Sequence, residues 1–224
     1  MKKLTFLFAA ILCTALCGAD VATIKKELKA AQKAKDHELS VQKCKELYAA
    51  STDAKDKFTA VYDQISALYA MKKDNEADAL LDAELEKDIH SAEYKQSLIV
   101  AYAARNLWIP KKAQEVNKKL KHAISLAPYK TGSFMCFRLY NYMLCNFCHY
   151  TKEYQLALDT AVPILDKATH LPHKLELTSR VASTYEKIGK KDEAIKYHKL
   201  CIEYAKKLKK DTSKIEKRIE ALSK

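Results

Sequence analysis

The stretch LELTSRVASTYEKIGKKDEAIKYHKLCIEYAKKL, residues 175–208, has the clearest pattern in this chain. Apolar and small residues recur at steps of three and four on both sides of one break, which predicts two amphipathic helices. Gly189 lies at that break and can adopt the left-handed conformation that ends a helix. Ala182, Ala194 and Cys201 are small and fall where two antiparallel helices must approach closely. The stretch therefore predicts a helical hairpin.

This hairpin resembles the tetratricopeptide repeat, a helix-turn-helix unit of about 34 residues that stacks into a superhelix. The residues that carry the resemblance are Val181, Ala182, Tyr185, Gly189, Ala194 and Cys201, with Cys201 in place of the usual alanine. Thr178 replaces the family's tryptophan, and Lys206 replaces its closing proline. The resemblance is best over residues 138–208 and looser over the rest of 60–224. It implies stacked helix pairs with a concave groove that binds a protein or peptide.

The chain beyond residue 19 contains few helix-breaking residues, because only Gly132 and Gly189 remain as glycines. This composition predicts an all-α fold, and the resemblance implies a right-handed α-solenoid of about five antiparallel helix pairs. The expected pairs are 20–35 with 38–51, 54–71 with 75–87, 91–107 with 110–127, 132–150 with 153–169, and 172–189 with 191–208. Residues 20–51 form a degenerate first pair, residues 54–208 the repeats, and residues 212–223 a C-terminal capping helix over the last apolar face. Pro163 falls inside an expected helix, where it predicts a kink.

Residues 1–19 show the three regions of a signal peptide in their usual order. Met1-Lys2-Lys3 is basic, the run from Leu4 to Leu16 is apolar but too short to span a bilayer, and Cys17-Gly18-Ala19 is a small-residue cleavage site. We expect cleavage after Ala19 and a bacterial protein, residues 20–224, that is periplasmic or secreted. Lipidation at Cys17 is the competing interpretation, although Leu16 stands where lipoproteins usually have a small residue.

Positive charge is concentrated at the C-terminus. The whole chain has a formal net charge of +12, and residues 187–224 hold 13 Lys and Arg against 6 Asp and Glu. Such a segment can attract nucleic acid or anionic lipid. We interpret most of these lysines as a solvated helix face, because they alternate with an apolar stripe. An exported protein rarely meets nucleic acid, so we expect none as a partner. Membrane contact is expected only through a lipidated Cys17 or this basic C-terminus.

The segment Cys145-Asn146-Phe147-Cys148-His149 has the C-x-x-C-H spacing of covalent haem attachment. That chemistry uses two thiols for the vinyl groups and the imidazole as an iron ligand. The repeat register instead assigns both cysteines to the interior. Three interpretations stay open: buried packing residues, which the register favours, a redox dithiol or disulfide, and a c-type haem.

Five cysteines follow residue 19, so at least one lies outside any intramolecular disulfide. His170 and His173 are spaced for a metal but lack a third ligand nearby, so no metal site is predicted. Nothing in the sequence is similar to a phosphate loop, a nucleophile elbow or a dinucleotide fingerprint. We therefore expect neither a cofactor nor catalysis.

The resemblance also implies which residues face a groove, because the family uses the exposed side of the first helix of each pair. The projected residues are Leu98, Ala101, Arg105, Trp108, Leu139, Tyr142, Asn146, His149, Tyr150, Glu176, Ser179, Ser183, Glu186 and Lys187. Asn146 matches a groove asparagine that binds a ligand's backbone. Aromatic residues would add apolar contact area, and an arginine would add a bidentate donor for carboxylate. An alternative that stays open is that the aromatic residues only pack between helices.

The sequence therefore predicts a non-enzymatic, exported scaffold or adaptor that binds a protein or peptide in a shallow groove. The partner-binding residues that we single out are Arg105, Trp108, Tyr142, Asn146, His149, Tyr150, Ser183 and Lys187. The alternative is a redox or c-type haem electron-transfer protein that uses Cys145, Cys148 and His149.

Overall fold

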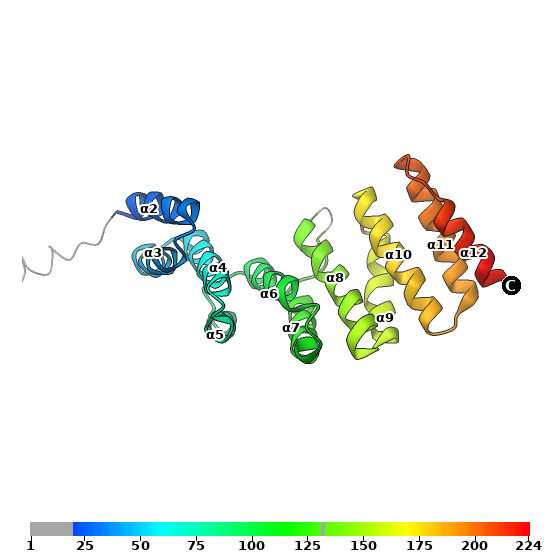
Figure 1. Cartoon of the computed structure of the whole chain (residues 1–224), viewed down its shortest axis with the longest axis horizontal. Helices are drawn as coiled ribbons and strands as arrows, with labels where there is room; N and C mark the ends of the chain where they lie inside the picture. Colours follow the sequence, from blue (N-terminus) through cyan, green and yellow to red (C-terminus); the bar gives the residue numbers. More distant parts are fainter. Residues whose placement is uncertain (1–19, 131–132) are drawn as a thin grey trace, which may run out of the picture. The chain divides into compact units, whose positions relative to one another are not determined.

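The computed structural model describes residues 20–130 and 133–224, and within these ranges it contains helices and turns but no β-strand. The predicted all-α fold is confirmed for these residues (Figure 1). The expected signal peptide, its cleavage site and Cys17 lie outside the described residues. The chain divides into two compact units, one up to His90 and one from Ser91 onward.

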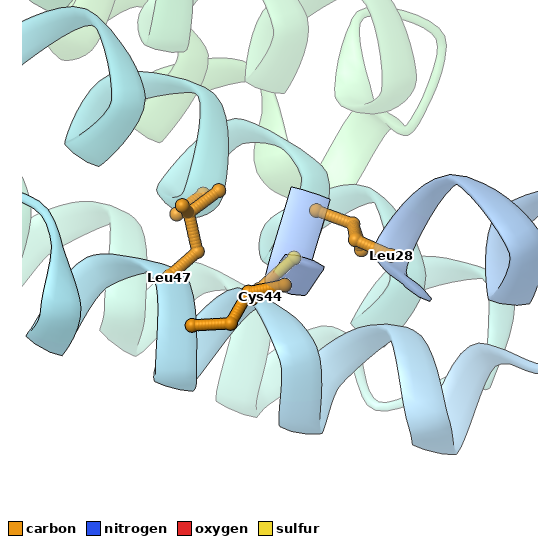
Figure 2. Close-up of a cluster of buried hydrophobic side chains, with 5 residues drawn as sticks. Leu28, Cys44 and Leu47 are labelled. Atoms are coloured by element: carbon orange, nitrogen blue, oxygen red, sulfur yellow. The ribbon is translucent and has the colours of Figure 1, made fainter. Parts of the chain in front are cut away.

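The first unit contains four helices, and each packs against the next: α2 (Val21–Ala34), α3 (His37–Ala50), α4 (Ala54–Ala70) and α5 (Asp74–Leu85). Asp36 and Asp53 cap α3 and α4, because their carboxylates accept hydrogen bonds from Leu39 N and Asp56 N. Leu28 from α2 meets Cys44 and Leu47 from α3 in one buried cluster (Figure 2). Cys44 is therefore a core residue of the first unit.

The second unit contains α6 (Ala92–Asn106), η1 (Pro110–Lys112), α7 (Ala113–Leu126), α8 (Phe134–Asn146), η2 (Phe147–Thr151), α9 (Tyr154–Leu165), α10 (Leu171–Lys187), α11 (Lys191–Lys207) and α12 (Ser213–Ser223). Each α-helix contacts the next along the chain, and α8 also contacts both α6 and α10. The first helices of successive predicted pairs therefore lie side by side in this unit (Figure 1).

The hairpin of α10 and α11 has the geometry that its sequence predicts. Gly189 follows α10 in the left-handed region, with φ of 76°, and ends the helix. Ala182, Ala194 and Cys201 are fully buried. Tyr185 of α10 stacks on Tyr197 of α11, with ring centroids 5.3 Å apart.

Two predicted helices have irregular turns that the sequence analysis missed. The expected helix 132–150 stops being α-helical at Asn146 and continues as the π-helix η2. The expected helix 110–127 starts with the 3₁₀ turn η1, which Pro110 opens, before α7 begins at Ala113. Pro163 does lie inside a helix, because α9 continues to Leu165.

After several other helices, a lysine adopts the left-handed conformation that Gly189 adopts after α10. Among the described residues, those with positive φ are Lys35, Lys72, Lys152, Gly189 and Lys209, and each follows a helix. At Lys72 the peptide N–H donates to Tyr69 O, and the next N–H donates to Leu68 O. This is the Schellman pattern that satisfies the last carbonyls of a helix.

No helix within residues 20–130 and 133–224 has both the length and the apolar character that crossing a bilayer requires.

Candidate functional site

An open cleft of about 820 Å³ lies along α8 and α10 in the second unit, with Lys210 and Ile215 of the α12 region at one edge. The α10 residues that line it follow one face of that helix: Pro172, His173, Leu175, Glu176, Ser179, Arg180, Ser183, Thr184 and Lys187. The α8 side contributes Leu144, Cys145, Cys148 and His149. The structure thus brings together His149, Ser183 and Lys187 from the predicted partner-binding set.

The charge of this cleft is positive. Glu176 is the one carboxylate among its lining residues, and it already accepts hydrogen bonds from Asn141 Nδ2 at 2.9 Å and Arg180 Nη2 at 3.1 Å. Lys187 lies at the other end, where its Nζ donates to Cys148 O over 3.3 Å. Partial burial, followed by the charges of Lys187 and Arg180, lowers the pKa of His149. The imidazole is therefore neutral at pH 7, and the fixed charge comes from lysine and arginine.

Cys145 and Cys148 lie at the bottom of the cleft as buried free thiols, 3% and 8% exposed. Cys148 Sγ is 3.0 Å from Thr184 Oγ1 of α10, so the thiol takes part in the contact between the two helices. Burial raises the pKa of both thiols. A thiol that is buried and protonated reacts poorly, so this arrangement favours packing over covalent attachment of haem or thiol exchange.

An aromatic cluster adjoins the cleft at His149. Trp108, in the turn after α6, is 58% exposed, and its ring centroid lies 5.7 Å from that of His149 and 6.5 Å from that of Tyr150. The π-helix η2 supplies both partners. Three predicted partner-binding residues, Trp108, His149 and Tyr150, therefore form one surface that continues into the cleft.

The expected exposure of Asn146 is wrong. Its side chain is fully buried, and Nδ2 donates to Ala113 O at 2.8 Å and to Asn117 Oδ1. Asn117 in turn donates to Thr151 Oγ1 and to Glu153 Oε1. Asn146 begins a chain of buried amides between α7, α8 and the start of α9, and its amide is not presented to a ligand.

Leu98 and Leu139 were also expected to face the groove. That expectation is wrong, because both side chains are buried, in α6 and α8. Tyr142 is half-buried, and its hydroxyl accepts hydrogen bonds from the Arg138 guanidinium rather than lining the cleft. Arg105 is exposed on α6 and is not part of the cleft lining.

Glu186 joins three helices beside the cleft. Its carboxylate accepts a hydrogen bond from Arg218 Nε of α12 at 2.8 Å and lies 2.6 Å from His198 Nε2 of α11. Burial alone would raise the pKa of Glu186, but the hydrogen bonds from Arg218 and His198 outweigh it and the pKa is lowered. A second hollow of about 540 Å³ lies here, and it shares Ser183, Lys187 and Ile215 with the cleft.

A buried polar cluster in the first unit was also missed by sequence reasoning. Glu84 and His90 are 3% and 4% exposed, and Glu84 accepts hydrogen bonds from Lys87 Nζ and Tyr48 Oη. His90 Nε2 lies 2.9 Å from Glu84 Oε2. No apolar periodicity marks these residues, so no sequence signal was available. The cluster joins α3 to the end of α5 and has the character of a structural network.

Within the described ranges, no group of three or more His, Cys, Asp or Glu residues is arranged to hold a metal ion. Comparison of the chain with protein-family models, with curated proteins and with solved structures found no match.

Proposed function

We propose that this chain is an exported, non-enzymatic scaffold or adaptor that binds a protein or peptide in the cleft along α8 and α10. In this proposal, residues 20–224 form a tetratricopeptide-like, right-handed α-solenoid of about five helix pairs. Residues 1–19 are its signal peptide, and α12 is its capping helix.

The observation that carries the proposal is the cleft itself. It follows the length of α10, it is open, and its polar residues Ser179, Ser183 and Lys187 recur at helical spacing along one face. An extended or helical segment can lie along such a face and contact each turn in succession. Trp108 adds an exposed aromatic side chain of the kind that often dominates binding energy.

The contacts between helices support the repeat part of the proposal. α6 contacts α8, and α8 contacts α10, while each also packs against its own hairpin partner. Stacked helical hairpins produce this pattern of contacts between first helices. The buried small residues of α10 and α11 occupy the positions that the family uses for close approach.

The alternative is a redox or c-type haem protein that uses Cys145, Cys148 and His149. All three residues line the cleft, which keeps them near one another. The burial and raised pKa of both thiols argue against it. A pyridine haemochrome spectrum of protein produced with a haem-attachment system tests this alternative, and any covalent haem signal would replace the scaffold proposal.

Blocking the cleft with a bulky side chain tests the binding proposal. Peptides selected from a random displayed library on the wild-type protein should lose at least about tenfold in affinity with Ser183→Trp, because the indole clashes with a peptide that lies along α10. Ser125→Trp is the matched control, since Ser125 is also exposed but lies on α7 outside the cleft. Selected peptides that bind Ser183→Trp as tightly as Ser125→Trp would exclude the cleft as the binding site.

Export is tested separately by the N-terminal sequence of the protein recovered from bacterial cells. Cleavage after Ala19 leaves Asp20 as the first residue. An N-terminus that retains residues 1–19 would remove export from the proposal without affecting the cleft.

A further inference from the structure

A compact group of lysines surrounds the turn between α11 and α12. Lys206, Lys207, Lys209, Lys210 and Lys214 are all exposed, and we name them the basic corner. They fall within nine residues of sequence, where the end of one helix and the start of the next are held together by a short turn. Figure 1 shows this turn at one end of the α11–α12 hairpin. The charges are therefore concentrated at a protruding end, not spread along a helix.

The backbone of this turn is fixed by hydrogen bonds. Lys209 has φ of 54°, and its N–H donates to Lys206 O at 3.0 Å. The N–H of Lys210 donates to Ala205 O at 2.9 Å, which completes a Schellman motif. Lys209 and Lys210 are consequently held on an ordered turn between the lysines that end α11 and the lysine that begins α12.

These charges are not neutralised within the described part of the chain. Asp211 is the one acid between Lys206 and Lys214, and its carboxylate accepts hydrogen bonds from Ser213 N at 3.0 Å and Ser213 Oγ at 2.8 Å. None of the described ion pairs involves a lysine of the basic corner. Clusters of four to eight basic residues on such a surface are attracted to anionic membranes, at about 1 kcal/mol per residue.

The composition of the corner indicates what kind of partner it suits. It contains lysine and no arginine, so it lacks the planar fork that recognises individual carboxylates or phosphates in a bidentate way. Lys210 borders the cleft and Lys214 borders the second hollow, whereas Lys206, Lys207 and Lys209 line neither of them. Several exposed single charges within one short segment match a diffuse, planar negative surface. We propose that the basic corner binds the anionic surface of a lipid membrane.

This proposal does not require a ligand in the cleft, although Lys210 lies at the edge of the cleft, and it predicts a defined binding experiment. The full chain should co-sediment with vesicles that contain about 30% phosphatidylglycerol in phosphatidylcholine, but not with pure phosphatidylcholine vesicles. The triple variant Lys206→Gln, Lys207→Gln, Lys214→Gln should partition about 100-fold less, since each lysine contributes about fivefold. None of these three residues lines the cleft.

The matched control is the triple variant Lys26→Gln, Lys29→Gln, Lys33→Gln in α2. These lysines are also exposed, and the change in net charge is the same. The control should partition within about twofold of the wild type. Equal losses in both triple variants would show that net charge alone drives association and would overturn the proposal.

Salt gives a test that needs no variant. Wild-type partitioning should fall by more than about tenfold between roughly 0.05 M and 0.5 M NaCl, because the screening length shortens well below the reach of exposed charges. Failure of the wild type to bind anionic vesicles at low salt would refute the proposal. So would binding to a free polyglutamate peptide or a DNA duplex without binding to vesicles, since this would identify a soluble polyanion as the partner.

Discussion

Lys72 follows α4 in the left-handed region that favours glycine, and Lys72→Gly is expected to stabilise the first unit. Its φ is 60°, and its peptide N–H donates to Tyr69 O at 3.0 Å, so the helix depends on this conformation for its last turn. The Lys72 side chain is exposed, and none of the described ion pairs involves it. The substitution therefore relieves the strain of a Cβ in the left-handed conformation and breaks none of the described ion pairs.

The size of the effect follows from two opposing contributions. A residue with a Cβ in the left-handed region costs about 1–2 kcal/mol, because the Cβ approaches the carbonyl oxygen too closely. Glycine makes the unfolded chain more flexible, which offsets about 0.4–1 kcal/mol of that gain. The net increase in the free energy of unfolding should be about 1 kcal/mol. A unit of this size should then melt about 4–8 °C higher.

Urea unfolding followed by far-ultraviolet circular dichroism measures this difference. Lys72→Ala is the matched control, because it removes the same charged side chain but keeps the Cβ. Lys72→Gly should be more stable than Lys72→Ala by about 1 kcal/mol. Equal stability of the two variants would refute the reasoning, since it would show that the left-handed lysine carries no strain.

Gly189→Ala provides the reciprocal experiment in the second unit. Gly189 has φ of 76°, and a Cβ built there meets nothing within 4 Å, so any cost comes from the backbone and not from a clash. The variant should lose about 1 kcal/mol of stability. Trp108 is the one tryptophan of the chain, so its fluorescence reports unfolding of this unit. A gain in stability would contradict the argument made for Lys72.

Three further outcomes are expected. Cys145 and Cys148 should react with an aromatic disulfide at pH 8 at least about tenfold more slowly in the native protein than in denaturant, because burial raises their pKa; mass mapping of the labelled peptides checks this. Glu84→Gln should destabilise the first unit at pH 7, and the difference from wild type should shrink as the pH falls below the ordinary glutamate pKa of about 4.3. The sign follows from the lowered pKa of Glu84: its stabilising effect is present above the unfolded-state pKa and is lost as the pH falls through the folded-state pKa. Asn146→Ala should cost about 1–3 kcal/mol in urea unfolding followed by Trp108 fluorescence, because Ala113 O and Asn117 Oδ1 lose their donor.

The spacing of apolar residues and the positions of glycine and proline were enough to predict most of the helices. The hairpin of α10 and α11 ends within two residues of its predicted bounds, since apolar spacing and Gly189 both act locally. The helix ends before Lys35, Lys72 and Lys209 also lie within one residue of their predicted bounds, but the left-handed conformation of these three lysines could not be predicted, because no glycine marks it. Lysine has no preference for that conformation, so only the surrounding hydrogen bonds select it.

The candidate site was predicted in part. Ser183 and Lys187 lie on a regular helix, so projecting a helical register places them correctly on the cleft. The same projection failed for Asn146, which lies one residue before the π-helix and packs toward α7 instead. The buried Asn117 did leave a signal, because it interrupts the apolar stripe of α7 between Val116 and Leu120. A polar residue on a core-facing stripe indicates a buried hydrogen-bonding partner.

The buried amides of Asn146 and Asn117 restrict which helices can pair during folding. Helices with similar apolar stripes can pair in more than one way, because hydrophobic contact does not depend strongly on which partner is present. Asn146 Nδ2 donates to Ala113 O and Asn117 Oδ1, so a different neighbouring helix would be costly, since it would leave this donor buried without hydrogen bonds. The asparagines therefore specify α7 as the neighbour of α8, much as a single buried asparagine fixes the register of a coiled coil.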